Sequence, residues 1–212
     1  SILTLTFKTP WRQHLVKIIR TPLVVLLCGL PLVALADLTA IPSGKYTLDK
    51  THGYITFSYS HLGFSTPQVG FNSFDVVLNL DTQNPQKSTL EVLIDAASID
   101  SRVEEFDEHL TGEEFFNTAK YPDIRFESTD IKKTGESTFD ILGNLTIMGQ
   151  THPVTFAATI NKAGKNPMKK VDALGVSAET KILRSQWGLG RYAPAVGDEV
   201  TIQVSAEMFY QE

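Results

Sequence analysis

The residues of this sequence best suited to chemistry are four histidines, His52, His61, His109 and His152. Imidazole nitrogens bind transition metals and exchange protons near neutral pH, so His61, His109 and His152 could serve a metal-dependent hydrolase or isomerase. Their spacing of about ten, fifty and forty residues matches no HExxH or HxH motif. The histidines therefore form a candidate metal site only if the fold brings them together.

Motifs of other catalytic classes are missing from the sequence, which has no GxSxG elbow, no P-loop and no GxGxxG fingerprint. Six carboxylates between residues 104 and 114 could include an acid/base pair, but an acidic run around a short helix is typical of a solvated face. Thr111 followed by Glu114 fits a capping box at the start of a helical turn. We therefore expect a protein that is not an enzyme.

The elements that must position these residues are mostly β-strands. Apolar and polar residues alternate with a period of two from Gly44 onward, and short polar connections separate the alternating runs. The pattern predicts about eight or nine strands, with a turn at Thr51-His52-Gly53 and a bend at Gly143. It is typical of an antiparallel barrel or a sandwich. Strands are expected near residues 45–49, 54–60, 68–81, 90–94, 124–131, 139–147, 154–160, 174–178 and 200–208, with a turn at Gly149-Gln150-Thr151.

The stretch from Ser101 to Ser128 breaks this alternation. Apolar residues recur there at intervals of three to five among acidic residues, as in a short amphipathic helix, and Tyr121-Pro122 ends the helical spacing. The spacing predicts a helical segment at about 101–118, with Phe115 and Phe116 facing the interior. Replacing both phenylalanines with serine is expected to weaken retention of a ligand more than it lowers fold stability.

The first 36 residues resemble a cleavable export signal. Four cations precede the apolar run from Leu23 to Leu35, and Ala34-Leu35-Ala36 offers a cleavage site before Asp37. We expect a periplasmic protein whose residues 37–212 form one domain without stable membrane insertion. Cleavage would remove Cys28, the single cysteine, and would leave fifteen Lys and Arg against 24 Asp and Glu, a net charge of −9. This acidic balance disfavours nucleic acid as a partner.

Several motifs follow one another along the chain. They are Asp107-Glu108-His109-Leu110, Glu114-Phe115-Phe116, the run from Lys120 to Ser128, and the run from Gly143 to Val154. Together and in this order they resemble the YceI-like family. Leu48-Asp49 with His52, and Val196-Gly197-Asp198-x-Val200, extend the resemblance over nearly the whole chain from about Tyr46. Phe106 departs from the pattern, because many relatives have an arginine there.

This resemblance implies an all-β fold, an extended antiparallel eight-stranded lipocalin-like β-barrel with the helical segment at its mouth. It also implies a long apolar ligand, a polyisoprenoid or quinone-type lipid, held inside the barrel by a periplasmic carrier, store or transport protein without another cofactor or a metal. A stress-related module with a filled core and a homodimer stay open as alternatives. The expected ligand-binding residues are Phe57, Tyr59, Phe64, Phe71, Phe74, Val76, Leu78, Val92, Phe106, Leu110, Phe115, Phe116, Phe126, Phe139, Ile141, Leu145, Phe156 and Trp187.

Overall fold

The computed structural model describes residues 37–212, and the expected export signal with Cys28 lies outside this range. Ten strands and one α-helix, α1 (Glu104–Thr111), make up most of the described chain. None of the helices in this range is both long and apolar enough to cross a membrane. The strands are β1 (Gly44–His61), β2 (Gln68–Phe71), β3 (Phe74–Leu80), β4 (Thr89–Asp95), β5 (Ile99–Asp100), β6 (Asp123–Lys133), β7 (Thr138–Ile147), β8 (Gln150–Lys165), β9 (Asp172–Leu183) and β10 (Val196–Gln211).

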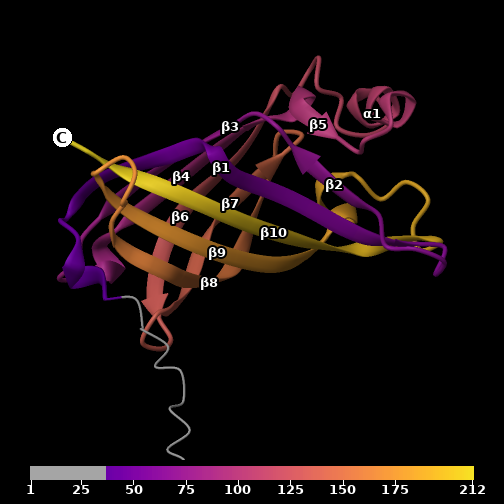
Figure 1. The fold of residues 1–212 in the computed structure, drawn as a ribbon. Helices are drawn as coiled ribbons and strands as arrows, with labels where there is room; N and C mark the ends of the chain where they lie inside the picture. The colour runs from indigo at the N-terminus through magenta and orange to yellow at the C-terminus, as the bar shows by residue number, and fades with distance from the viewer. Residues whose placement is uncertain (1–36) are drawn as a thin grey trace, which may run out of the picture. The chain divides into compact units, whose positions relative to one another are not determined.

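Eight of these strands close into an antiparallel barrel, as Figure 1 shows. The order β1-β3-β4-β6-β7-β8-β9-β10 is closed by pairing of β10 with β1, which leaves no open edge in the barrel wall. The short strands β2 and β5 extend the sheet beside the second half of β1. The prediction of an all-β, eight-stranded antiparallel barrel with one short helix is confirmed.

Strand β1 corrects one expectation, since residues 51–53 do not form a turn between two strands. The strand runs through all 18 residues, and its pairing with β10 shifts register between Leu48 and Gly53. Within this bulge the Asp49 carboxylate accepts hydrogen bonds from the Thr51 N–H and hydroxyl. An Asx-type turn and a glycine therefore bend the strand without ending it.

The long strand expected at 68–81 is instead divided into β2 and β3. At the break the Asn72 N–H donates to the Ser98 carbonyl, and the Ser73 N–H donates to the Ser98 hydroxyl. Because β2 pairs with the second half of β1 and β3 with its first half, one bent strand receives two partners on the same side.

The bend predicted at Gly143 is confirmed, although the extra residue lies in the neighbouring strand. Gly143 pairs with Ser128, directly beside a register shift between Ser128 and Asp130 in β6. A Cβ atom on Gly143 would overlap the ring of Phe126, so the missing side chain lets this ring cross β7. The close approach explains the glycine inside the strand.

The helical segment is shorter than predicted, since α1 covers only residues 104–111 and turns follow it. Three acidic residues occupy its first turn, where the helix dipole favours negative charge. The predicted capping box is wrong. Thr111 is the last helical residue and its hydroxyl donates to the Asp107 and Glu108 carbonyls, while Glu114 pairs with Arg191.

The two ends of the barrel differ. We call the mouth the end at which β1 stops at His61 and β10 begins at Val196; α1 and the connection 184–195 lie there (Figure 1). The opposite end, with the connection between β8 and β9, is packed around Tyr46 and Leu174, which are almost fully buried. The Tyr46 hydroxyl donates to the Pro42 carbonyl across 2.7 Å. The closed end and the mouth together define a barrel that opens on one side.

Candidate ligand-binding cavity

A cavity of about 340 Å³ runs through the interior of the barrel. All eight barrel strands contribute lining residues, and so do β2, α1 and the turn that follows α1. Alternation along each strand directs every second side chain inward, which is why the lining is almost entirely aliphatic and aromatic. Its volume lies in the range of about 300–1,000 Å³ that is usual for small-molecule sites.

Aromatic contacts anchor the segment after α1 to the barrel. The Phe116 ring lies 6.0 Å from that of Phe71 and 6.4 Å from that of Phe57, centroid to centroid, and Phe116 is buried. The Phe115 ring instead lies 4.7 Å from the imidazole of His109 and 6.4 Å from the ring of Tyr192, at the mouth. The two adjacent phenylalanines therefore occupy different environments, one in the wall and one at the rim.

Polar side chains enter the cavity lining only near the mouth. They are Tyr59, His61, His109, Arg184, Arg191 and Tyr192. Burial raises the pKa of the Tyr59 hydroxyl, which therefore remains a neutral hydrogen-bond donor at physiological pH. The cavity thus has an apolar interior and a polar rim.

Arg184 holds the loop at the mouth in place. Its guanidinium donates to four main-chain carbonyls, those of Leu189, Arg191, Val196 and Gly197. Burial lowers the pKa of Arg184, yet a guanidinium stays charged at any physiological pH. Because its donors bind the main chain, Arg184 shapes the rim of the cavity, whereas Arg191 is half exposed and pairs with Glu114 at 2.6 Å.

Comparison with known proteins places this barrel in a family. Residues 46–208 match the YceI-like domain. The chain belongs to the YceI-like domain family. A UPF0312 protein of Azotobacter vinelandii is 36% identical over 167 residues, 78% of this chain and 86% of that protein. A UPF0312 protein of Pseudomonas fluorescens is 35% identical over 176 residues, 82% of this chain and 91% of that protein.

Solved structures agree with this YceI-like barrel in fold. BcnA of Burkholderia cenocepacia has a TM-score of 0.68 at 21% identity, over 76% of this chain and 98% of that one. The YceI protein of Campylobacter jejuni has a TM-score of 0.65 at 25% identity, over 72% and 90%. A domain from Saccharophagus degradans, described as polyisoprenoid-binding, has a TM-score of 0.59 at 13% identity, over 78% and 98%.

The YceI-like barrel brings thirteen of the eighteen expected ligand-binding residues together around the cavity. Their contact with a ligand stays a prediction, but their common position follows from strand alternation and closure. The thirteen are Phe57, Tyr59, Phe71, Val76, Val92, Phe106, Leu110, Phe115, Phe116, Phe126, Ile141, Leu145 and Phe156.

The other five do not line the cavity. Phe64 is 91% exposed, in the turn after β1. Phe74 packs beside Gly53 in the bulge of β1, and Leu78 and Phe139 are buried toward the closed end. Trp187 is buried behind β7, where its indole N–H donates to the Leu145 carbonyl. Alternation indicates that a residue faces inward, but it cannot distinguish packed core from cavity wall.

Several lining residues were missed by the reasoning from sequence. Strand β10 contributes six apolar side chains, and the alternation from Val200 to Met208 in the sequence already indicated a strand. They were not named as ligand-binding because no aromatic residue marks them. Arg184, Arg191 and Tyr192 reach the mouth through a connection with no sequence pattern. The six residues of β10 are Val196, Val200, Ile202, Val204, Ala206 and Met208.

The histidines expected to support a hydrolase do not form a metal site in the described chain. His61 and His109 line the mouth, whereas the His152 ring packs against the indole of Trp187 with centroids 4.9 Å apart. Among residues 37–212, the group with metal-ligand spacing is Asp49, His52 and Glu207, with ligand atoms within 4.8 Å of one another. The hydrolase alternative is therefore not favoured.

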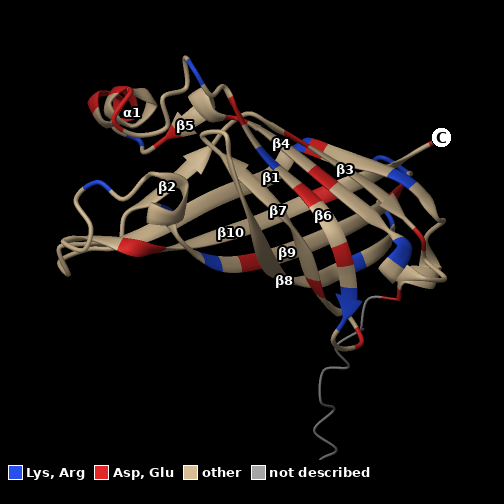
Figure 2. Ribbon diagram, turned by 180° about the vertical axis from the view of Figure 1, so that it is seen from behind, with Lys and Arg blue, Asp and Glu red and all other residues tan. Residues whose placement is uncertain are grey.

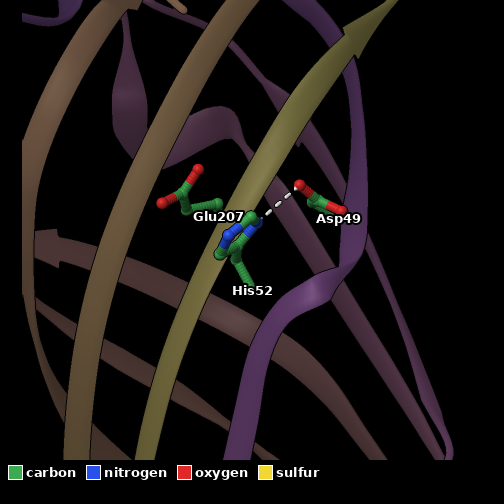
Figure 3. Close-up of side chains that lie close together, drawn as sticks. All are labelled: Asp49, His52 and Glu207. Atoms are coloured by element: carbon green, nitrogen blue, oxygen red, sulfur yellow. Dashed lines mark hydrogen bonds and ion pairs between the residues drawn. The ribbon is translucent and has the colours of Figure 1, made fainter. Parts of the chain in front are cut away.

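Within the group of Asp49, His52 and Glu207, drawn in Figure 3, Asp49 and His52 have a structural role. His52 Nδ1 lies 2.9 Å from one carboxylate oxygen of Asp49, and the Lys169 ammonium lies 3.5 Å from the same oxygen. The other oxygen accepts both hydrogen bonds of Thr51. These hydrogen bonds, led by that of His52, hold the pKa of Asp49 well below its usual range. The cluster fastens the bulge of β1.

Proposed function

We propose that this protein binds one long polyisoprenoid or similar lipid chain inside the barrel and acts as a periplasmic carrier or store for it. The observation that supports the proposal is the apolar cavity, which is closed at one end and has a polar rim at the other. The description of the Saccharophagus degradans domain as polyisoprenoid-binding points in the same direction. The export-signal pattern in residues 1–36 supports the periplasmic location.

The energetics favour a long chain over a small ligand. Each buried CH₂ group contributes about 0.8 kcal/mol, and association costs about 4–15 kcal/mol before any net affinity remains. Between about five and twenty buried CH₂ groups are thus needed to offset that cost, which corresponds to about one to four isoprene units. A ligand held by this term needs no charged partner deep in the barrel.

The position of the polar side chains orients the ligand. A chain inserted with its tail toward the closed end leaves its polar end beside Tyr59, His61 and His109 at the mouth. The tyrosine hydroxyl and the imidazole N–H groups can donate to an oxygen of a quinone or an alcohol. We therefore infer that the apolar tail enters first and that the head group stays near solvent.

Extraction of the purified protein tests the proposal directly. Organic extracts analysed by mass spectrometry should contain a prenyl or other long-chain lipid at about one equivalent per protein. Protein without bound lipid should take up an added polyprenyl alcohol in detergent solution. Lipid-free protein that also refuses the added alcohol contradicts the proposed function.

A cavity-filling variant gives the matched control. Ala178 of β9 lines the cavity, whereas Ala157 of the neighbouring strand β8 is exposed on the outer face. Ala178→Phe should reduce uptake of the polyprenyl alcohol at least about tenfold, because the added ring occupies volume the chain needs. Ala157→Phe should leave uptake unchanged. Equal uptake by both variants would show that the cavity does not hold the chain.

A further inference from the structure

Three large apolar side chains are exposed around the mouth of the cavity. Phe64 is 91% exposed, and Leu62 and Tyr192 are each 53% exposed. Leu62 and Phe64 belong to the turn after β1, and Tyr192 belongs to the connection between β9 and β10. Both segments lie at the same end of the barrel (Figure 1). We call these three residues the rim patch.

One hydrogen bond joins the two segments of the rim patch, and a second one closes the turn after β1 itself. The Leu62 N–H donates to the Ala195 carbonyl at 3.1 Å, and the Phe64 N–H donates to the His61 carbonyl at 3.0 Å. Leu62 and Gly63 have positive φ angles of 54° and 75°, so the chain turns back sharply and leaves the Phe64 side chain in solvent. The exposure of Phe64 is therefore a property of an ordered turn.

Apolar surface continues from the rim patch into the cavity. Tyr192 belongs to both, since it is half exposed and also lines the cavity next to Phe115. His61, directly before the turn, is another lining residue. A lipid that leaves a membrane at this point would pass from one apolar phase to another along protein side chains. A monomeric protein in water gains nothing from such exposure.

The charges beside the rim patch determine which kind of lipid surface it can approach. Glu104, Glu105 and Asp107 lie in the first turn of α1 at the same end of the barrel, where Figure 2 shows acidic residues concentrated. Arg191, next to Tyr192, is paired with Glu114. An anionic surface would be repelled by this helix, whereas a zwitterionic surface would not.

We propose that the rim patch docks the mouth of the barrel transiently on a zwitterionic phospholipid bilayer, from which the ligand enters the cavity without crossing water. The proposal rests on the proposed lipid-binding function. Three side chains bury too little apolar area to attach the protein permanently to the bilayer. Binding is therefore reversible, as a carrier that must dissociate with its bound lipid requires. Phe64, the most exposed of the three, inserts first.

The test measures transfer of a fluorescent polyprenyl alcohol from phosphatidylcholine vesicles to the full protein. Phe64→Ser should lower the transfer rate about tenfold, because burial of a phenylalanine side chain changes a partition constant by about that factor or more. Met168→Ser is the matched control, since Met168 is 89% exposed in the connection between β8 and β9 at the opposite end. It should leave the rate unchanged. Equal rates for both variants overturn the docking proposal.

Two further arms separate the ways in which the test can fail. The same alcohol offered in detergent micelles should bind both variants with wild-type affinity; no binding by any protein refutes the function itself, independently of docking. Vesicles containing phosphatidylglycerol should transfer more slowly than phosphatidylcholine at low salt, and added salt should narrow the difference. Faster transfer from the anionic vesicles overturns the choice of surface. Loss of a homodimer in Phe64→Ser, seen by light scattering, would assign the rim patch to self-association instead.

Discussion

The two adjacent phenylalanines after α1 offer the sharpest test of the division between wall and rim. Phe116 is 8% exposed and packs against Phe57 and Phe71. Truncation of a core phenylalanine to alanine usually costs about 3–5 kcal/mol. For a domain of this size each kcal/mol shifts the melting temperature by about 2–4 °C, so Phe116→Ala should lower it by about 10 °C. Differential scanning calorimetry of the ligand-free protein measures this shift.

Phe115 should behave differently, because it is only partly buried and lies at the rim against His109 and Tyr192. Phe115→Ala removes about half the apolar contact of a core ring, so its cost in stability should be about 1–2 kcal/mol. Its main effect should be on release of a bound polyprenyl alcohol, with a dissociation rate at least about five times higher than that of the wild type. Stopped-flow transfer to acceptor vesicles measures this rate.

Interchanged or equal effects of the two variants would refute the assignment of Phe116 to the barrel wall and of Phe115 to the rim. A large loss of stability in Phe115→Ala with unchanged release would show that the rim segment is only a lid on a packed core. The sequence predicts that loss of both rings weakens ligand retention more than it lowers stability. From the structure, we expect this balance only for Phe115. Phe116 is expected to affect stability first, because its ring belongs to the barrel wall.

Two further predictions concern the barrel wall. Asp49→Asn should lower the free energy of unfolding by about 1–3 kcal/mol at pH 7, since the carboxylate that accepts from His52 is lost. The pKa of Asp49 is lower in the folded protein than the value of 3.8 for the unfolded chain, so ionised Asp49 stabilises the fold above pH 3.8 and this stabilisation declines as the pH falls below it. Urea unfolding should therefore show a smaller difference in stability between Asp49→Asn and the wild type at pH 3 than at pH 7. An equal difference at both pH values would refute the role assigned to Asp49. Gly143→Ala should destabilise the protein by about 1–3 kcal/mol because the new methyl group meets the ring of Phe126, whereas Gly70→Ala, whose nearest contact would be at 3.6 Å, should cost less than about 1 kcal/mol. Similar costs for the two glycines would contradict the close approach.

Much of the fold follows from the sequence because strand alternation is a local signal. The alternation of apolar and polar residues predicts which side chains of β4, β6 and β10 face inward. The bend at Gly143 was predictable in the same way, since a glycine inside an alternating run usually marks a bulge or a close approach of another chain segment. The continuity of β1 was not, because Thr51-His52-Gly53 has the composition of a turn, and only its pairing with β10 across the bulge keeps it in a strand.

Part of the candidate site could also be predicted from the sequence, whereas the rest depends on the tertiary structure. Phe57, Phe126 and Phe156 could be placed inside the barrel from the sequence, since their strands alternate and their rings are large. Phe139 has the same pattern but lies in the packed part of the barrel. Whether an inward ring borders space or other side chains depends on how far the opposite wall lies, and no local pattern encodes that distance.

The sequence by itself determined the class of fold, the family motifs and the acidic, helical interruption after β5, because each of these depends on a pattern among residues close together in the chain. The tertiary structure alone decided that β1 and β10 close the barrel, that Arg184 fixes the loop at the mouth, and that Leu62, Phe64 and Tyr192 meet around one opening. The closure and the rim patch join residues that lie far apart in the chain. They arise from closure of the sheet, which is a property of all eight strands together.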